Sequence, residues 1–170
     1  MNPYRPLKQR THPILFSIGI FALAAALLAG CGHHQNRSSD SAPHLHVDTP
    51  PHGGTPVALG DDYQIEWVLD APSGLLQAYV LDGEMENFVR IAAPSFELKA
   101  KLPSREEVLH FAAVANTATG ETVGSTALFE ARADWLKTNK TFGAVLPAIN
   151  VEGTVFTNVA FNFPKGNDKE

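Results

Sequence analysis

"YQIEWVLDAPSGLLQAYVL", residues 63–81, contains two runs of strand-forming residues joined by a short turn sequence. In the first run, every second residue from Tyr63 to Leu69 is large and apolar, which is the period-two pattern of a strand with one buried face. The segment Asp70–Gly74 supplies Pro, Ser and Gly, the residues of a hairpin connection, before Leu75 begins the return run. The stretch therefore predicts an antiparallel β-hairpin.

The same pattern continues along the chain. A first strand is expected to start near Thr55, and further strands at 88–91, 96–101, 108–114, 124–132, 148–152 and 155–163. One helical turn is expected at 133–137, with Trp135 and Leu136 closing an end of the core. About eight short strands at spacings near ten residues predict an all-β fold, a single antiparallel β-sandwich or barrel-like domain over residues 55–164. The residues expected largely inside it are Tyr63, Ile65, Trp67, Tyr79, Phe96, Phe111, Phe129, Val159 and Phe161.

The first thirty residues have the layout of an export signal. Basic residues at the start are followed by the apolar run 14–28, which is shorter than the roughly twenty residues of a comfortable membrane span. The run ends in Leu28-Ala-Gly-Cys31, which resembles the bacterial lipobox, where the cysteine sulfur receives a diacylglyceryl group. Residues 1–30 are therefore predicted to be a lipoprotein signal peptide and Cys31 the lipidation site. The alternative, a transmembrane anchor, fits poorly with the abrupt polar change after Gly32.

Lipidation implies attachment to a membrane of the bacterial cell envelope, facing the periplasm. By resemblance to the sorting rule of well-studied Gram-negative bacteria, Gly32 in place of Asp favours the outer membrane over the inner membrane. Residues 31–54 are rich in His, Ser and Pro and are expected to form a disordered tether, and 165–170 a polar tail. Loss of residues 1–30 removes three basic and no acidic residues, which leaves ten Lys and Arg against eighteen Asp and Glu, a formal charge of −8. This charge argues against nucleic acid as a partner.

No sequence motif of a hydrolase, a nucleotide site or a zinc protease is present, so the chain is not expected to be an enzyme. His110 alternates with apolar residues in its strand and is expected to be a hydrogen-bonded core or edge residue rather than a base. The turn sequence Asp82-Gly-Glu84-Met-Glu86 offers oxygen ligands for calcium, but it lacks the ligand count of an EF-hand loop. A solvated turn is the favoured interpretation.

Histidines in the tether are the candidate metal ligands. His44 and His46 lie on the same side of an extended segment, His52 can close a third position, and Asp48 can supply an oxygen. Imidazole with carboxylate suits Zn(II), Cu(II) or Ni(II), and Zn(II) or Cu(II) is the expected ion. A site on a flexible segment must order that segment on binding, which weakens affinity. The alternative is a hydrated tether that binds nothing.

Two long stretches, 51–91 and 133–167, carry an HGG-x-x-V-x-LG-x-x-Y-x-x-E start, an AYVLDG strand and an FNFPKG end. They resemble a group of uncharacterised bacterial lipoproteins, and a similar module lies beside or within periplasmic adaptor subunits of heavy-metal efflux systems of the resistance-nodulation-division type. The group itself has no established activity, and the efflux-like module is one motivation for the metal-handling hypothesis below. In that group the residue after AYVLDG is often His, whereas here it is Glu84.

The sequence supports two hypotheses from different classes. In the first, the chain is an envelope-anchored binding module that handles a divalent metal or docks onto a metal-efflux system. In the second, it is a structural or adhesive lipoprotein that contacts another envelope protein without any ligand.

Overall fold

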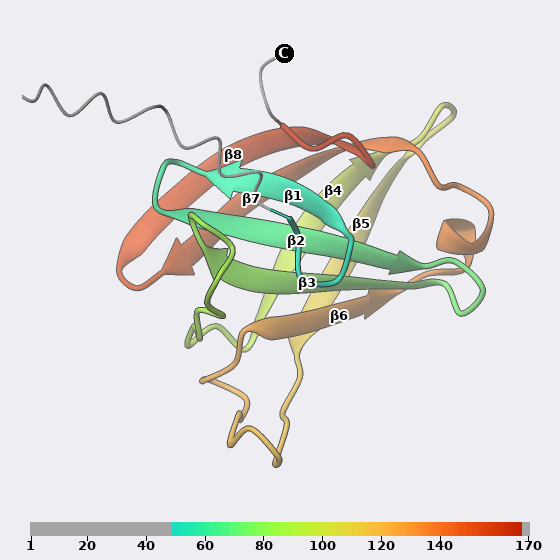
Figure 1. The fold of residues 1–170 in the computed structure, drawn as a ribbon. Coiled ribbons are helices and arrows are strands. Elements are labelled where there is room, and N and C mark those ends of the chain that lie inside the picture. Colours follow the sequence, from blue (N-terminus) through green and yellow to red (C-terminus); the bar gives the residue numbers. More distant parts are fainter. Residues whose placement is uncertain (1–48, 168–170) are drawn as a thin grey trace, which may run out of the picture. The chain divides into compact units, whose positions relative to one another are not determined.

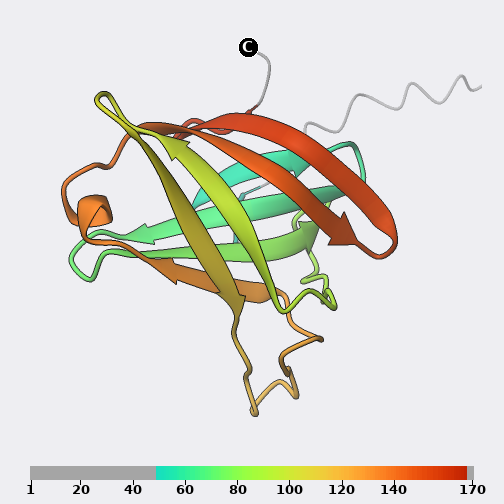
Figure 2. The same cartoon turned by 180° about the vertical axis from the view of Figure 1, so that it is seen from behind.

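In the computed structural model, which describes residues 49–167, the chain forms one antiparallel sheet that curls into a nearly closed barrel (Figure 1). The sheet order is β1-β2-β3-β6-β5-β4-β7-β8. The strands are β1 (Thr55–Leu59), β2 (Tyr63–Asp70), β3 (Leu75–Asp82), β4 (Ser95–Lys101), β5 (Glu106–Ala113), β6 (Leu128–Arg132), β7 (Phe142–Val151) and β8 (Thr154–Phe163). The all-β prediction is confirmed, in its barrel-like form. Seen from behind, β4, β5, β7 and β8 make the wall opposite β1, β2, β3 and β6 (Figure 2).

The β2–β3 hairpin has the predicted form. Its strands pair along their full length, from Tyr63 opposite Asp82 to Asp70 opposite Leu75. The turn closes with a hydrogen bond from the Gly74 N–H to the Ala71 carbonyl, and Gly74 adopts a φ of 66° that favours glycine.

Two other strand predictions were wrong. Residues 88–91 form no strand and contribute only isolated bridges, Leu81 with Phe88 and Ile91 with Thr126. β7 begins at Phe142, well before the expected start at residue 148. Phe142 and Leu146 point inward, but the small residues between them give only a weak alternating pattern, so the first half of the strand was not predicted. The extra length of β7 gives β4 a second partner besides β5 and allows the sheet to curl into a barrel.

The barrel interior is built around Trp67, which has no exposed surface. Its indole stacks on Phe161 and meets Phe96 and Phe111 edge-on, with centroids 5.3 to 6.3 Å away. Six of the predicted core residues are confirmed as buried, namely Ile65, Trp67, Phe96, Phe111, Phe129 and Phe161.

The other three predicted core residues are only partly buried. Tyr63 and Val159 are partly buried and pack against the core. Tyr79 lies on the outer face of the sheet, because the inward positions of β3 are taken by Leu76, Ala78 and Val80. The outward position of Tyr79 matters for the site described below.

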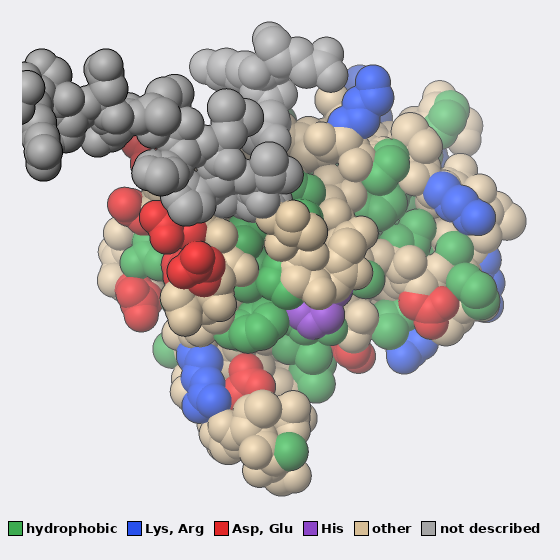
Figure 3. Space-filling model, viewed as in Figure 1, with side chains coloured by type: hydrophobic (Ala, Val, Ile, Leu, Met, Phe, Trp, Pro, Cys, Tyr) green, Lys and Arg blue, Asp and Glu red, His purple; other side chains and the backbone are tan. Residues whose placement is uncertain are grey.

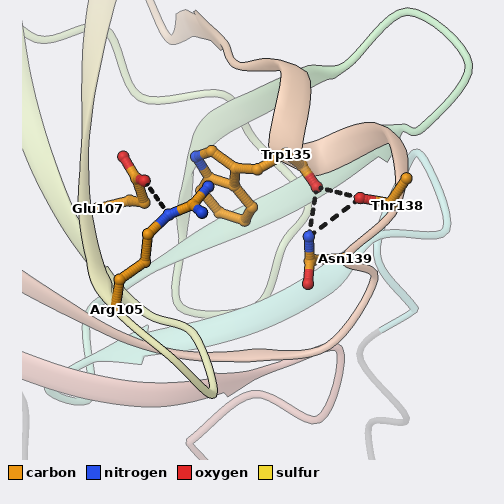
Figure 4. Close-up of polar contacts among 5 residues, drawn as sticks. All are labelled: Arg105, Glu107, Trp135, Thr138 and Asn139. Carbon is orange, nitrogen blue, oxygen red and sulfur yellow. Dashed lines mark hydrogen bonds and ion pairs between the residues drawn. The ribbon is translucent and has the colours of Figure 1, made fainter.

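A 3₁₀ turn, η1 (Asp134–Lys137), closes one end of the barrel where a helical turn was expected. Leu136 is fully buried and Trp135 packs edge-on against Phe142. The Trp135 carbonyl accepts hydrogen bonds from the side chains of Thr138 and Asn139, and Arg105, which pairs with Glu107, points toward the indole (Figure 4). Within residues 49–167, no helix is long and apolar enough to cross a membrane.

The seam between β1 and β8 is closed by a side chain. Asn167 accepts the Ala58 N–H at 2.8 Å and donates to the Ala58 carbonyl at 3.0 Å, so its amide takes the place of a strand residue. The Thr55 hydroxyl donates to the Pro164 carbonyl at 3.2 Å. The stretch expected to be a polar tail therefore contributes, through Asn167, to closing the barrel.

Candidate functional site

Glu66 projects from the outer face of β2 and yet has no exposed surface. The chain ahead of β1 folds over it and supplies three donors. Glu66 Oε1 accepts the backbone N–H groups of His52 and Gly54, each at 2.8 Å, and Oε2 accepts from His52 Nδ1 at 2.8 Å. A buried carboxylate without such partners would be strongly unfavourable. Residues 52–54, which precede the predicted boundary at residue 55, are thus hydrogen-bonded to the barrel.

The two glycines of His52-Gly-Gly make this turn possible. Gly53 has a φ of 68°, a left-handed conformation that side chains with a Cβ rarely adopt. A Cβ at Gly54 would lie 2.6 Å from the Trp67 carbonyl oxygen and 2.9 Å from Glu66 Cγ. Gly53 thus supplies the positive φ of this turn, and Gly54 allows the close approach of the backbone to β2. His52 and Glu66, the first and last residues of the sequence pattern that starts with HGG and ends with E, therefore contact each other.

The His52 ring is fixed by its neighbours. It stacks on Tyr79 with centroids 3.8 Å apart and planes 15° apart, and the Phe88 ring lies 5.7 Å away. Tyr79 is the cross-strand neighbour of Glu66, which places it beneath the imidazole. Burial, and then the negative charges of Glu130 and Glu66, raise the pKa of Tyr79.

The hydrogen bond to Glu66 determines which ring nitrogen of His52 is available. An ionised carboxylate only accepts, so Nδ1 carries the proton and the neutral ring keeps its lone pair on Nε2. Within the described residues no hydrogen bond is found at Nε2, and the side chain is 34% exposed. A carboxylate on one ring nitrogen with the other free is the usual arrangement of a metal-binding histidine.

A pocket of about 530 Å³ lies beside His52. Its walls come from β3, the segment 87–90 and the loop 114–127 that connects β5 to β6, and the apolar side includes Phe88, which is 51% exposed. On the face shown in Figure 3, hydrophobic side chains gather around a histidine. The lining residues are His52, Tyr79, Asn87, Phe88, Arg90, Asn116, Thr119, Glu121, Ala127 and Leu128.

Glu121 organises the loop wall of this pocket. Its carboxylate accepts the Ala127 N–H at 2.9 Å and the hydroxyls of Thr119 at 2.6 Å and Thr126 at 3.2 Å. These hydrogen bonds, with that from Ala127 the largest cause, lower the pKa of Glu121. Arg90 Nη2 donates to the Thr119 carbonyl at 2.7 Å and so connects the two walls.

Of the predicted metal ligands, the structure describes His52 alone. His44, His46 and Asp48 lie outside the described residues, as does the predicted lipidation site Cys31. Among residues 49–167, no three His, Cys, Asp or Glu side chains come together as a metal cluster. The four-residue metal site stays a prediction, and the structure describes the surroundings of one of its ligands, His52.

His110 was expected on an apolar core face or at an edge, and its face was assigned wrongly. It lies on the outer face of β5 with 73% of its side chain exposed, and its Nδ1 is 3.3 Å from Glu97 Oε1 on β4. The alternating apolar neighbours Val108 and Ala112 share this outer face, whereas Leu109 and Phe111 face the core.

The acidic turn after β3 uses one carboxylate internally. Asp82 accepts the N–H groups of Glu86 and Asn87 and the Asn87 side-chain amide, and the last of these contacts is the largest cause that lowers the pKa of Asp82. Glu84 and Glu86 are exposed. The geometry is that of a self-capped, solvated turn, as the sequence favoured.

Sequence reasoning missed Glu66 and Tyr79 as site residues. Both stand on strand faces, and period-two alternation places Glu66 toward solvent. The available signal was the pattern itself, in which a histidine with two glycines precedes a strand and a glutamate follows in the next one.

Comparisons of the chain with protein-family models, with curated proteins and with solved structures find no match.

Proposed function

We propose that this protein is an envelope-anchored binding module in which His52 Nε2 is the fixed donor for a borderline divalent ion, Zn(II) or Cu(II). The observation that supports the proposal is the 2.8 Å contact between His52 Nδ1 and the buried Glu66. This contact orients the ring and selects the tautomer with a free Nε2. The stack on Tyr79 restricts ring rotation further.

The remaining ligands of the proposed site are His44, His46 and Asp48, which precede His52 by four to eight positions. An extended chain covers about 3.3–3.6 Å per residue, so all three are within reach of the His52 ring. Ordering this segment costs entropy, which makes the site weak and adjustable. Lipid on Cys31 would keep the module at the outer membrane, where it could pass metal to an efflux assembly. Mass spectrometry of the mature N-terminus tests the anchor.

Calorimetric titration of residues 33–170 with Zn(II), Cu(II) and Ni(II) tests the metal proposal. Glu66→Gln is expected to weaken metal binding by about 10–100-fold, because loss of the carboxylate partner of a metal-binding histidine typically lowers affinity by that factor. Combined loss of the His44, His46 and His52 side chains abolishes binding, and single losses do less because His33 and His34 can substitute. Affinity falls on acidification, since histidine must be neutral to bind a metal ion and protons compete for the same nitrogen.

His110→Ala is the matched control, because His110 is an exposed histidine held by a carboxylate on another part of the barrel. It should leave the titration unchanged. Equal Zn(II) and Cu(II) binding by the triple variant and the natural chain would contradict the proposal. That result would favour the alternative, a structural or adhesive lipoprotein in which Glu66 simply fastens the entering chain to the barrel.

A further inference from the structure

The pocket beside His52 has walls that the barrel itself does not require. β5 and β6 are joined by the loop 114–127, which is as long as loops that usually have a function in compact domains. Glu121 and Thr126 hold this loop in shape, and Arg90 ties it to the segment after β3. A volume of about 530 Å³ lies within the usual range of small-molecule sites.

Several polar atoms at the pocket have capacity that the described chain does not use. Asn87 donates its amide to Asp82, which leaves Oδ1 as an acceptor. Asn116 accepts the Ala118 N–H on Oδ1, which leaves the two donors of Nδ2. His52 Nε2 adds an acceptor, and the Tyr79 hydroxyl can both donate and accept. The pocket therefore offers donors and acceptors together, and neither kind predominates.

The charges around the pocket compensate each other. Arg90 and Glu121 are its ionised lining residues, of opposite sign, and each is already engaged with the loop. No excess charge is left to select an anion or a cation. The apolar side is aromatic, with Phe88 half exposed and the Tyr79 and His52 rings stacked beside it.

We propose that this pocket binds a neutral saccharide. A sugar ring has an apolar face of C–H groups that packs on an aromatic ring, and a rim of hydroxyls that both donate and accept hydrogen bonds. Phe88 provides the exposed ring, and the free atoms of Asn87, Asn116 and His52 provide the polar partners. The proposal goes beyond metal binding, because it requires neither His44 nor His46 and uses side chains that a metal site would not need.

The test uses the whole protein, purified in a detergent without a sugar head group. Maltotriose, cellotriose and the trisaccharide of N-acetylglucosamine are titrated by calorimetry, beside a proline-rich peptide of about ten residues, which aromatic grooves also bind. Saturable binding of at least one trisaccharide is expected. Phe88→Ala should weaken it about tenfold or more, as truncation of an aromatic anchor does. Asn116→Ala should weaken it by a smaller factor.

Val155→Ala is the control, since Val155 is 59% exposed on β8, away from the pocket. The His44→Ala/His46→Ala double variant, which the metal proposal predicts to lose Zn(II) affinity, should keep full saccharide binding, so the two proposals can fail separately. Absence of binding to all three trisaccharides would overturn the saccharide proposal. Equal saccharide affinity in Phe88→Ala, or binding of the peptide alone, would also overturn it.

Discussion

At the scale of single residues, Glu66 is an acidic side chain whose burial depends on the segment that precedes β1. Its two oxygens accept from His52 twice and from Gly54 once, and these contacts fasten residues 52–54 to the sheet. The same three hydrogen bonds determine the direction of the His52 ring. Stability and the setting of the site are therefore coupled through one carboxylate.

Glu66→Gln keeps the size of the side chain but replaces one acceptor oxygen with an NH₂ group that faces another donor. A buried donor left without a partner costs about 1–3 kcal/mol, so the free energy of unfolding should fall by that amount. Urea unfolding followed by tryptophan fluorescence measures it. Glu97→Gln, at an exposed carboxylate paired with His110, is the control and should change stability by less than about 0.5 kcal/mol. Equal effects of the two changes would mean that Glu66 does not hold the turn.

At the scale of elements, the loop 114–127 depends on an ionised Glu121. The pKa of this group is lowered from its ordinary value of 4.5, chiefly by the Ala127 N–H. A carboxylate with a lowered folded-state pKa contributes stability that is fully present above 4.5 and lost as the pH falls through the folded-state value. The loop, and the pocket it lines, should therefore loosen in acid.

Unfolding free energies measured from about pH 7 to about pH 3 test this dependence. Glu121→Gln should be less stable than the natural chain at neutral pH and should lose less stability on acidification. Glu84→Gln, at an exposed position in the turn after β3, should reproduce the natural profile. A Glu121→Gln profile parallel to the natural one would show that Glu121 is not the group responsible.

At the scale of the whole molecule, the barrel is organised around Trp67 on β2, and its aromatic neighbours Phe96, Phe111 and Phe161 come from the opposite wall. Trp67→Ala would leave a large cavity and should cost about 3–5 kcal/mol. Circular dichroism should show a β-rich spectrum for the natural chain and a lower melting temperature for the variant. Val155→Ala, on an exposed side chain of β8, should melt like the natural chain. A fully stable Trp67→Ala variant would contradict the central position of the indole.

The sequence predicts this molecule well where alternation is clean and poorly where it is not. The β2–β3 hairpin follows from its alternating residues and its Pro-Ser-Gly turn. β3 itself is apolar on both faces, so periodicity cannot tell that Tyr79 points outward. The first half of β7 could not be predicted, because Gly143, Ala144 and Pro147 have low strand propensity.

The site was harder to predict than the barrel. His52 was identified as a candidate ligand from the sequence, and the structure describes its ring. Its partner Glu66 was not identified, because burial of an outward-facing residue depends on a covering segment and not on the strand that carries it. His44, His46 and Asp48 precede the described residues and stay predicted ligands.

Nitrogen-15 NMR of the His52 ring at neutral pH tests whether Glu66 leaves Nε2 free to bind a metal ion, since it reports which ring nitrogen carries the proton. We predict a protonated Nδ1 and an unprotonated Nε2 whose resonance shifts when Zn(II) is added, and we expect the Glu66→Gln variant to lose this preference. A ring protonated on Nε2, or an Nε2 resonance that does not respond to Zn(II), would contradict this prediction.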